Sequence, residues 1–307
     1  MKHLISIYDL TLDEINEIFE LSVLMKKCLK EGNEHSYLKG KTLGMIFAKS
    51  STRTRVSFEV GMYQLGGYPL FLSSNDIQLG RGETIYDTAQ VLSRYLDGIM
   101  IRTFDHKDVL DLARYGSIPV INGLTDLMHP CQVLADLFTV YEKRSCLKGL
   151  KLAYIGDGNN MAHSLLHGCS KVGMDIAVAT PKEFECNNSI INEAMEDAKI
   201  SGANILITND PSKAIYNADV VYTDTWVSMG QEIEKAERIN IFKPYQINSE
   251  LFSLAKSDAL FLHCLPAYRG FEVTDDIIDG PNSVVFDEAE NRLHVQKAIM
   301  AKLMGNL

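Results

Sequence analysis

The sequence predicts an α/β protein of two domains, each a parallel sheet flanked by helices, with linking and C-terminal helices packing between them. Short apolar runs rich in β-branched residues alternate with longer stretches of helical period, the pattern of strands and covering helices. The length of 307 residues suits two domains of roughly 100–200 residues each. Residues 1–150 carry 17 basic and 18 acidic side chains (−1), whereas residues 151–307 carry 13 and 22 (−9). The two halves therefore differ in charge as well as position.

Ten short apolar runs are the expected strands. In the first half they are Thr42–Ala48, Pro69–Leu72, Gly98–Ile101 and Pro119–Ile121. In the second half they are Lys151–Ile155, Ile176–Ala179, Ile205–Thr208, Val220–Thr223, Ala259–His263 and Ser283–Phe286. Runs of this kind between helical segments are typical of a parallel sheet.

Helical spacing of apolar residues sets the domain limits. A helix over Val133–Tyr141 leads into Lys143–Gly149 and joins the domains near residue 148. A second helix is expected over Glu290–Leu303, and the polar segment Gly230–Tyr245 is expected to be a surface excursion. These limits give domains over 1–147 and 148–288, followed by a C-terminal helix within 289–307.

Composition argues against several classes of protein. A pI near 5.3 without any run of basic residues disfavours sequence-independent binding of nucleic acid. The first residues meet acids by Asp9 without an apolar signal core, and no stretch approaches the ~20 apolar residues of a membrane span. The six cysteines lack paired spacing, which disfavours a disulfide framework or zinc site. We expect a cytoplasmic protein with free thiols and no metal.

The segment STRTR, residues 51–55, follows the first expected strand and opens a helix. Ser51 or Thr52 is a favourable N-cap. Two arginines in a first turn oppose the helix dipole at a cost of roughly 0.3–1 kcal/mol each when exposed, and a bound anion would reverse that sign. Backbone N–H groups, hydroxyls and arginine forks together make a phosphate cradle. Taken alone, the segment is equally consistent with a solvated helix start.

The segment HPCQ, residues 129–132, starts another helix. Pro130 suits its first position and His129 its cap. A histidine at a helix amino terminus is biased toward the neutral form, so its N–H can polarise a carbonyl group. Gln132 lies in the same turn and can add a donor. The alternative is a capping histidine with no role in chemistry.

Two further segments follow expected strands of the second half. DTWVSMG, residues 224–230, places Asp224 at the carboxyl end of a strand, where open α/β sheets bind ligands, and a cationic amine suits that carboxylate. HCLPA, residues 263–267, ends a later strand, and Pro266 restricts the turn beside Cys264. The alternatives are an ordinary Asp turn for the first segment and a core thiol for the second.

A glycine-containing turn, GDGNN at residues 156–160, follows the first strand of the second half and opens a helix. A dinucleotide-binding turn has the same setting, but this one lacks the third glycine of GxGxxG. No acidic residue stands about 20 positions further on after a second strand. The dinucleotide signal is therefore incomplete.

Together these segments resemble the aspartate/ornithine carbamoyltransferase superfamily, in order and at family-like spacing over nearly the whole chain. STRTR and HPCQ are shared across the superfamily, and DTWVSMG and HCLPA are similar to its ornithine branch. The resemblance implies transfer of the carbamoyl group of carbamoyl phosphate to the δ-amine of L-ornithine, giving L-citrulline and phosphate. It also implies a homotrimer, or a multiple of one, with active sites between subunits.

The resemblance also implies which residues form the site. Carbamoyl phosphate would contact Ser51, Thr52, Arg53, Thr54, Arg55, Gln78, Arg102, His129, Gln132, Cys264, Leu265 and Arg292. Gln78 would come from a neighbouring subunit, and Arg292 would return to the first domain in the C-terminal helix. Ornithine would contact Asn160, Asp224, Ser228 and Met229, with Cys264 and Leu265 near the reacting amine. Catalytic roles would fall to Arg102, His129, Asp224 and Cys264.

The residue types suit carbamoyl transfer. Thr54, Arg102 and His129 can donate to the carbonyl oxygen, the electrostatic role of an oxyanion hole. Arg53 and the helix terminus neutralise the leaving phosphate, which can itself accept the amine's proton. No metal, cofactor or covalent intermediate is required. We expect Asp224 and Cys264 to orient the amine and favour its neutral form.

Two alternatives to this function remain open. One is a transferase of the same superfamily that uses another amine, such as putrescine or an acylated ornithine. Ser228 and the backbone beside Asp224 suit an α-amino acid head group, which favours ornithine. The other is a non-catalytic protein on dinucleotide-binding-like domains, which the complete arginine and histidine set disfavours. The sequence leaves the anabolic or catabolic direction open, because both use the same site.

Overall fold

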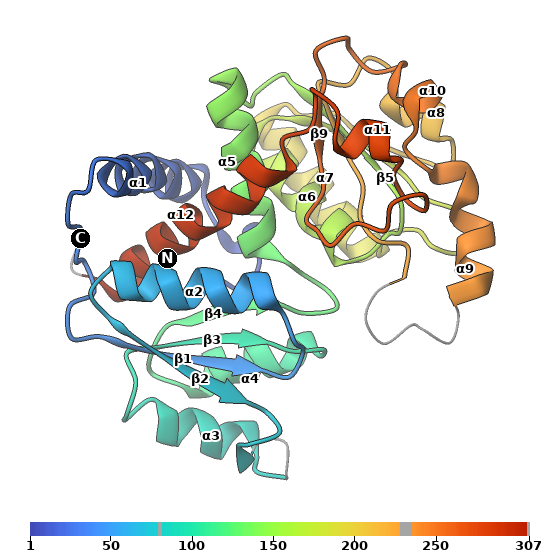
Figure 1. Cartoon of the computed structure of the whole chain (residues 1–307). Helices are drawn as coiled ribbons and strands as arrows, with labels where there is room; N and C mark the ends of the chain where they lie inside the picture. Colours follow the sequence, from blue (N-terminus) through green and yellow to red (C-terminus); the bar gives the residue numbers. More distant parts are fainter. Residues whose placement is uncertain (79–81, 228–234, 306–307) are drawn as a thin grey trace. The chain divides into compact units, whose positions relative to one another are not determined.

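The computed structural model describes residues 1–78, 82–227 and 235–305, and the chain divides into two compact units (Figure 1). The first unit comprises Met1–Ala135 with Glu290–Leu307, and the second comprises Asp136–Ala289. Each unit holds one parallel sheet, so the predicted α/β class is confirmed. Within the described ranges, no helix is long and apolar enough to cross a membrane.

The sheet of the first unit has four strands in the order β2-β1-β3-β4. Their bounds are β1 Thr42–Phe47, β2 Tyr68–Ser73, β3 Gly98–Arg102 and β4 Val120–Leu124. All paired strands run parallel. The strands β1, β3 and β4 are buried almost throughout, which explains why they read as continuous apolar runs.

Helices cover both faces of this sheet (Figure 1). On one face, α3 Ile85–Leu92 and α4 His106–Tyr115 share an apolar cluster with Ile46, Ile99 and Val120 of the strands. On the other face lie α2 Thr52–Gln64 and α12 Val285–Met304. These two helices touch at Gly61, where an added Cβ would lie 3.1–3.5 Å from Met300, Lys297 and Leu293. The helix α1 Leu12–Lys30 is tied to α12 by a 2.6 Å bond from Lys26 Nζ to Asn291 Oδ1.

The strand order of the first unit reverses between β1 and β3, because the chain leaves β1 toward β2 and returns to the opposite side of β1. Open α/β sheets bind ligands at such a switch point, outside the carboxyl ends of the strands. Here Ser51 follows β1 and Arg102 ends β3. The backbone N–H of Ala48 donates to the Arg102 carbonyl at 2.9 Å, which holds the two strand ends together.

The sheet of the second unit has five parallel strands in the order β7-β6-β5-β8-β9. Their bounds are β5 Lys151–Ile155, β6 Asp175–Ala179, β7 Ile205–Thr208, β8 Val220–Tyr222 and β9 Leu260–Leu262. The order reverses between β5 and β8, so this unit has a switch point of its own. Asp157 and Asn159 follow β5 there, and Asp224 follows β8.

The helices of the second unit secure these strands. The helix α6 Asn160–Val172 packs on β6 and on α7 Asn188–Ser201. The short helices α8 Pro211–Ile215 and α11 Asp275–Ile278 contribute to an apolar core that includes Ala153, Ile155 and Phe261. The helix α10 Ser249–Phe252 packs against the same core through Leu251 and Phe252. The helix predicted over Val133–Tyr141 is α5 Pro130–Arg144, and the chain passes from the first unit to the second within it, after Ala135, and not near residue 148.

One predicted strand is wrong. The run Ser283–Phe286 forms a single bridge, from Ser283 to Phe261, and the helix α12 already begins at Val285. A short apolar run is compatible with either a strand or the buried start of a helix. Asp287 and Glu288 lie in the first turn of α12, where acidic side chains favour the positive end of the helix dipole.

The predicted surface excursion over Gly230–Tyr245 has mostly exposed or half-buried residues where the chain is described, but it is regular structure and not a loop. Residues 230–234 lie outside the described ranges, but the helix α9 Lys235–Phe242 and the 3-10 turn η4 Lys243–Tyr245 follow. Phe242 and Tyr245 are buried. The Tyr245 hydroxyl also donates to the Asn209 carbonyl at 2.7 Å. Buried aromatic side chains therefore anchor a segment whose overall polarity suggests a loop.

Candidate active site

The first unit gathers hydroxyl and guanidinium groups at the amino end of α2. Ser51 caps this helix, and its Oγ accepts a bond from the Thr54 backbone N–H at 3.2 Å. Arg292 of α12 donates from Nη2 to Thr54 Oγ1 at 2.9 Å. Thr54 is fully buried and Arg292 nearly so, so this bond is shielded from water. The structure thus joins two predicted site residues that are far apart in the sequence.

His129 is the electrostatic centre of this group. It precedes α5 and is buried, as are Arg102 at the end of β3 and Gln132 in the first turn of α5. Burial holds the pKa of His129 well below its ordinary value, and Arg292, Arg102 and Arg53 lower it further. The predicted neutral imidazole is therefore supported. Three guanidinium groups near a neutral histidine, beside a helix amino end, form a site suited to a small anion.

Two of the basic side chains near STRTR have local partners instead. Lys49 Nζ lies 2.6 Å from Asp126 Oδ1 and sits over the Phe104 ring. Arg55 Nε lies 2.9 Å from Glu59 on the next helical turn, and its guanidinium stacks 3.7 Å from the Phe71 ring centroid. Arg55 is exposed, unlike Thr54 beside it. Arg55 therefore lies outside the group around His129.

Two other predicted contacts of the first unit are also exposed. Thr52 is the first residue of α2, one position after the cap. Gln78 lies beyond the end of β2. Their roles stay predictions.

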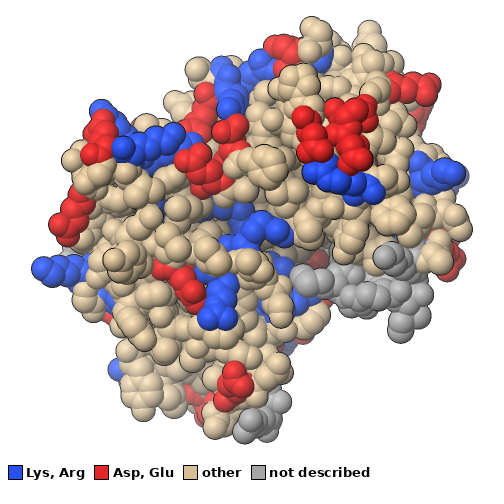
Figure 2. All heavy atoms as spheres, viewed as in Figure 1, with Lys and Arg blue, Asp and Glu red and all other residues tan. Residues whose placement is uncertain are grey.

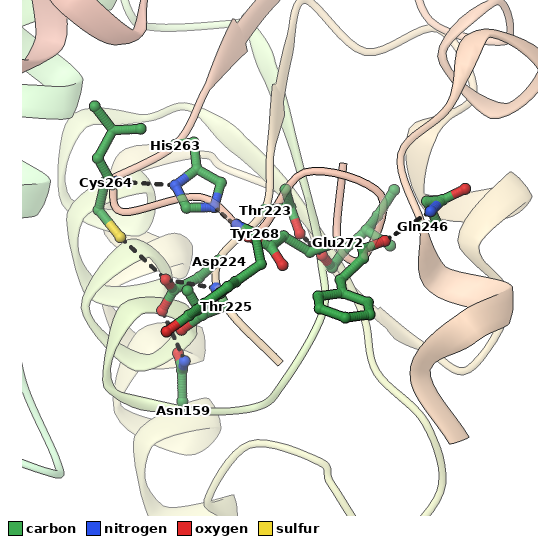
Figure 3. Close-up of polar contacts among 12 residues, drawn as sticks. Asn159, Thr223, Asp224, Thr225, Gln246, His263, Cys264, Tyr268 and Glu272 are labelled. Carbon is green, nitrogen blue, oxygen red and sulfur yellow. Dashed lines mark hydrogen bonds and ion pairs between the residues drawn. The ribbon is translucent and has the colours of Figure 1, made fainter. Parts of the chain in front are cut away.

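In the second unit, Asp224 lies at the switch point with both carboxylate oxygens hydrogen-bonded (Figure 3). Oδ2 accepts from Asn159 Nδ2 at 2.9 Å. Oδ1 accepts from the Thr225 backbone N–H at 2.7 Å and from Cys264 Sγ at 3.1 Å. Asp224 itself is 7% exposed. These bonds orient a nearly buried carboxylate, which is the group expected to receive a cationic amine.

Cys264 lies on a turn held by its neighbours (Figure 3). Burial raises the pKa of the Cys264 thiol well above its ordinary value, and the adjacent Asp224 raises it further, so the thiol stays protonated and donates. Leu265 adopts a left-handed φ of 54°, which is uncommon for a side chain of its size. Its backbone N–H donates to His263 Nδ1 at 2.9 Å, and His263 Nε2 lies 3.2 Å from Glu272 Oε1. Buried His263 and Glu272 thus hold this turn in place.

The structure adds Asn159 to the predicted site. The side chain that contacts Asp224 belongs to Asn159, the N-cap of α6, whereas Asn160 is the first residue of that helix. Asn159 Oδ1 also accepts from the Met161 backbone N–H at 2.9 Å, so one side chain both caps α6 and fixes Asp224. An N-cap signal was available in GDGNN. Ser228 and Met229 lie outside the described residues.

In the turn after β5, the backbone at Gly158 packs closely against another segment of the same unit. A Cβ on Gly158 would lie 2.5 Å from backbone atoms of Phe184, Glu185 and Cys186. The Gly158 N–H also donates to the Phe184 carbonyl at 2.9 Å. In dinucleotide-binding turns the glycine instead lets the backbone approach a pyrophosphate. The space beside Gly158 is filled by the 184–186 segment, which disfavours the dinucleotide alternative.

The visible surface of each unit carries mixed charge. Lys and Arg side chains are interspersed with Asp and Glu over the face shown in Figure 2. An extended polyanion requires a continuous cationic surface. The buried arginines around His129 instead suit one small anion.

Comparisons with known proteins identify the family of both units. Residues 2–142 match the family described as aspartate/ornithine carbamoyltransferase, carbamoyl-P binding domain, and residues 148–303 match the corresponding Asp/Orn binding domain. The ornithine carbamoyltransferase of Caldicellulosiruptor saccharolyticus is 61% identical over 300 residues, covering 98% of this chain and 97% of that relative.

Solved structures of ornithine carbamoyltransferases are also similar to this chain. The ornithine carbamoyltransferase from Pyrococcus furiosus has a TM-score of 0.97 and 55% identity, covering 100% of this chain and 98% of that one. The anabolic ornithine carbamoyltransferase from Campylobacter jejuni has a TM-score of 0.92 and 45% identity, covering 99% of each chain. The similarity therefore extends over both units.

Proposed function

The chain belongs to the aspartate/ornithine carbamoyltransferase family, and from that premise we propose that it transfers the carbamoyl group of carbamoyl phosphate to the δ-amine of L-ornithine, giving L-citrulline and phosphate. The observation that carries this proposal is the convergence of Arg53, Arg102 and Arg292 on a neutral His129. Such a group matches a dianionic phosphate joined to a neutral carbamoyl group, because guanidinium groups bind the first and a neutral N–H donor suits the second.

Carbamoyl phosphate is assigned to the first unit. Ser51, Thr52, Arg53 and the amino end of α2 bind its phosphate, and Arg55 joins them by leaving Glu59. Thr54, Arg102 and His129 donate to the carbonyl oxygen, and Gln132 assists from the first turn of α5. Arg292 Nη2 and Ser51 Oγ both donate to Thr54 Oγ1, which orients the Thr54 proton away from them. That orientation supports a donor role for Thr54.

Ornithine is assigned to the second unit. Asp224 binds the side-chain amine at the switch point, and Cys264 and Leu265 line the same end of the sheet. Asn160, Ser228 and Met229 complete the ornithine site, with the latter two recognising the amino acid head group. The acidic balance of residues 151–307 favours such a cation.

The reaction itself needs only these groups and the substrates. The neutral δ-nitrogen attacks the carbonyl carbon, a C–N bond forms, and negative charge develops on the carbonyl oxygen. The bond from that carbon to the phosphate oxygen then breaks, and the departing phosphate takes a proton from the amine. Donors fixed before the reaction stabilise the developing charge without reorganisation, and holding both substrates together lowers the entropic cost.

The proposal also covers the oligomeric state of the protein and the metabolic direction in which it acts. We assign the chain to a homotrimer or a multiple of one, with Gln78 completing the site of a neighbouring subunit. We assign it the anabolic direction, toward arginine, because the Campylobacter jejuni relative carries that name. We also propose that this synthesis of citrulline takes place in the cytoplasm.

A ureido assay tests the function directly. Purified protein is given carbamoyl phosphate with ornithine, putrescine, acetylornithine or aspartate, and ureido product is measured. We expect turnover with ornithine. Turnover only with another amine would overturn the substrate assignment, and NAD binding by equilibrium dialysis without carbamoyl phosphate binding would instead favour a non-catalytic binding protein.

A further inference from the structure

Arg238 is a buried arginine of α9 that no step of the proposed reaction uses. Its Nε donates to the Trp226 carbonyl at 2.7 Å, and its Nη2 forms an ion pair with Asp157 Oδ2. The guanidinium carbon lies 4.7 Å from the Phe184 ring centroid and 5.1 Å from that of Phe242. One rigid, planar group therefore contacts two turns of the second unit while it packs against two aromatic rings.

Both turns lead to Asp224. Asp157 lies two residues before Asn159, whose amide donates to Asp224 Oδ2. Trp226 lies two residues after Asp224. Arg238, Asp157, Asn159 and Asp224 thus form a closed ring of contacts that returns to Arg238 through the Trp226 carbonyl. Movement of either turn would displace the Asp224 carboxylate.

The residues of this ring are shielded from water, so their polar groups depend on one another as partners. Arg238 is 4% exposed and Trp226 3%, and Asp157 is also buried. Inside a protein, hydrogen bonds and ion pairs are stronger than in water, and an unpaired buried charge is costly. Removing either partner would therefore rearrange the two turns rather than leave them in place.

We propose that Arg238 is a positioning residue that holds Asp224 in register to receive the amine of ornithine. This inference rests on the proposed function. Arg238 acts through the Trp226 carbonyl and Asp157 and does not touch the substrate. Asp157 is its partner in this role, because it fixes the turn that carries Asn159.

Steady-state kinetics of four variants test the inference. R238M removes the charge at similar volume, R238K keeps the charge without the planar fork, and D157N removes the partner charge. The matched control is R144M, which breaks the Arg144–Asp258 ion pair of the same unit away from these turns. KM is measured for each substrate at saturating concentration of the other, with the melting temperature of every variant.

R238M and D157N are expected to raise the KM for ornithine about tenfold or more, since one tenfold step corresponds to about 1.4 kcal/mol and small misplacements are costly. The KM for carbamoyl phosphate should stay within about twofold, because its proposed site lies in the other unit. The ornithine KM of R238K should lie between those of R238M and the parent, because a lysine cannot donate to both partners in the same geometry. R144M should leave both KM values unchanged.

An unchanged ornithine KM in R238M and D157N, or an equal rise in both KM values, would overturn the positioning role. If R238M fails to fold, R238K and D157N decide the outcome. A parent protein that makes no citrulline would refute the proposed function itself. An active parent whose ornithine KM survives these substitutions refutes only the role of Arg238.

Discussion

The Cys264 thiol donates a 3.1 Å hydrogen bond to Asp224 Oδ1, while the Asn159 amide donates to the other carboxylate oxygen at 2.9 Å. Because burial and Asp224 raise the pKa of Cys264, the sulfur holds its proton and acts as a donor, not as a thiolate nucleophile. The pair therefore orients a carboxylate. This geometry supports the proposal that the reacting amine is positioned at the same point.

Replacing Cys264 by alanine tests that proposal. We expect kcat/KM for ornithine to fall about tenfold, as a hydrogen bond to a charged group contributes roughly 1.5–3 kcal/mol. The acid limb of the pH profile should move to higher pH, because the amine is held less well in its neutral form. Cys146→Ala is the control, since Cys146 is an exposed thiol of the same unit. Full activity with an unchanged pH profile in Cys264→Ala would refute the role.

Arg53 and Arg55 are expected to differ in their contribution to phosphate binding. Arg53 acts electrostatically on His129, whereas Arg55 is exposed and already pairs with Glu59 and Phe71. Arg53→Met should raise the KM for carbamoyl phosphate about 10–100-fold, from the loss of charge-assisted hydrogen bonds. Arg55→Met should have a smaller effect. Initial rates at varied carbamoyl phosphate decide between them, and a larger effect at Arg55 would contradict this order.

Most of the fold could be predicted because the strands are short, buried and separated by helical periods. Nine of the ten expected strands form among the described residues. The exception, Ser283–Phe286, shows the limit of periodicity, because the three consecutive apolar residues after Ser283 lie at the start of a helix and yet resemble a strand. The chain near Tyr245 shows a second limit. Its buried aromatic side chains contact residues that are distant in the sequence, such as Asn209, so no local pattern reveals them.

The sequence predicts those residues of the candidate site that lie at the ends of strands. Ser51 and Asp224 follow strands and Arg102 ends one, and a parallel sheet gathers such positions at its carboxyl edge. Asn159 was not distinguished from Asn160, because a shift of one residue at a helix start turns the side chain by about 100°. The Arg238–Asp157 pair joins residues 81 positions apart and leaves no local signal in the sequence.

Acid should destabilise the protein partly through His294. Burial lowers the pKa of His294 to about 3, and Lys297 and Lys26 contribute. Below its unfolded pKa of about 6.5, the unfolded chain binds a proton that the folded chain resists, so stability falls as pH falls through that range. At pH 5 this loss reaches about 2 kcal/mol.

The measurement is the fall in melting temperature between pH 7.5 and pH 5. His294→Gln removes the titrating group, so its melting temperature should fall less than that of the parent. The variant is compared with itself at the two pH values, which separates titration from any packing change. An equal fall in parent and variant would show that His294 stays unprotonated in both states or titrates alike in both.

A shared active site predicts complementation between two inactive variants. Arg292 donates to Thr54 of its own chain, so it acts within one subunit, whereas Gln78 is proposed to act on a neighbouring subunit. Arg292→Met and Gln78→Ala should each reduce activity severely when assembled alone. In trimers formed at random from equal amounts of both, about a quarter of the sites combine an intact Arg292 with an intact neighbouring Gln78.

The two variants are co-expressed with different affinity tags, and hybrids carrying both tags are isolated before the ureido assay. Recovered citrulline formation in the hybrids, above the sum of the separate variants, would support a site built by two subunits. As a control for the purification, each variant is co-expressed with itself under the two different tags and isolated in the same way. If Gln78 instead served its own chain, every site in a hybrid would lack either Arg292 or Gln78, and mixing would restore no activity.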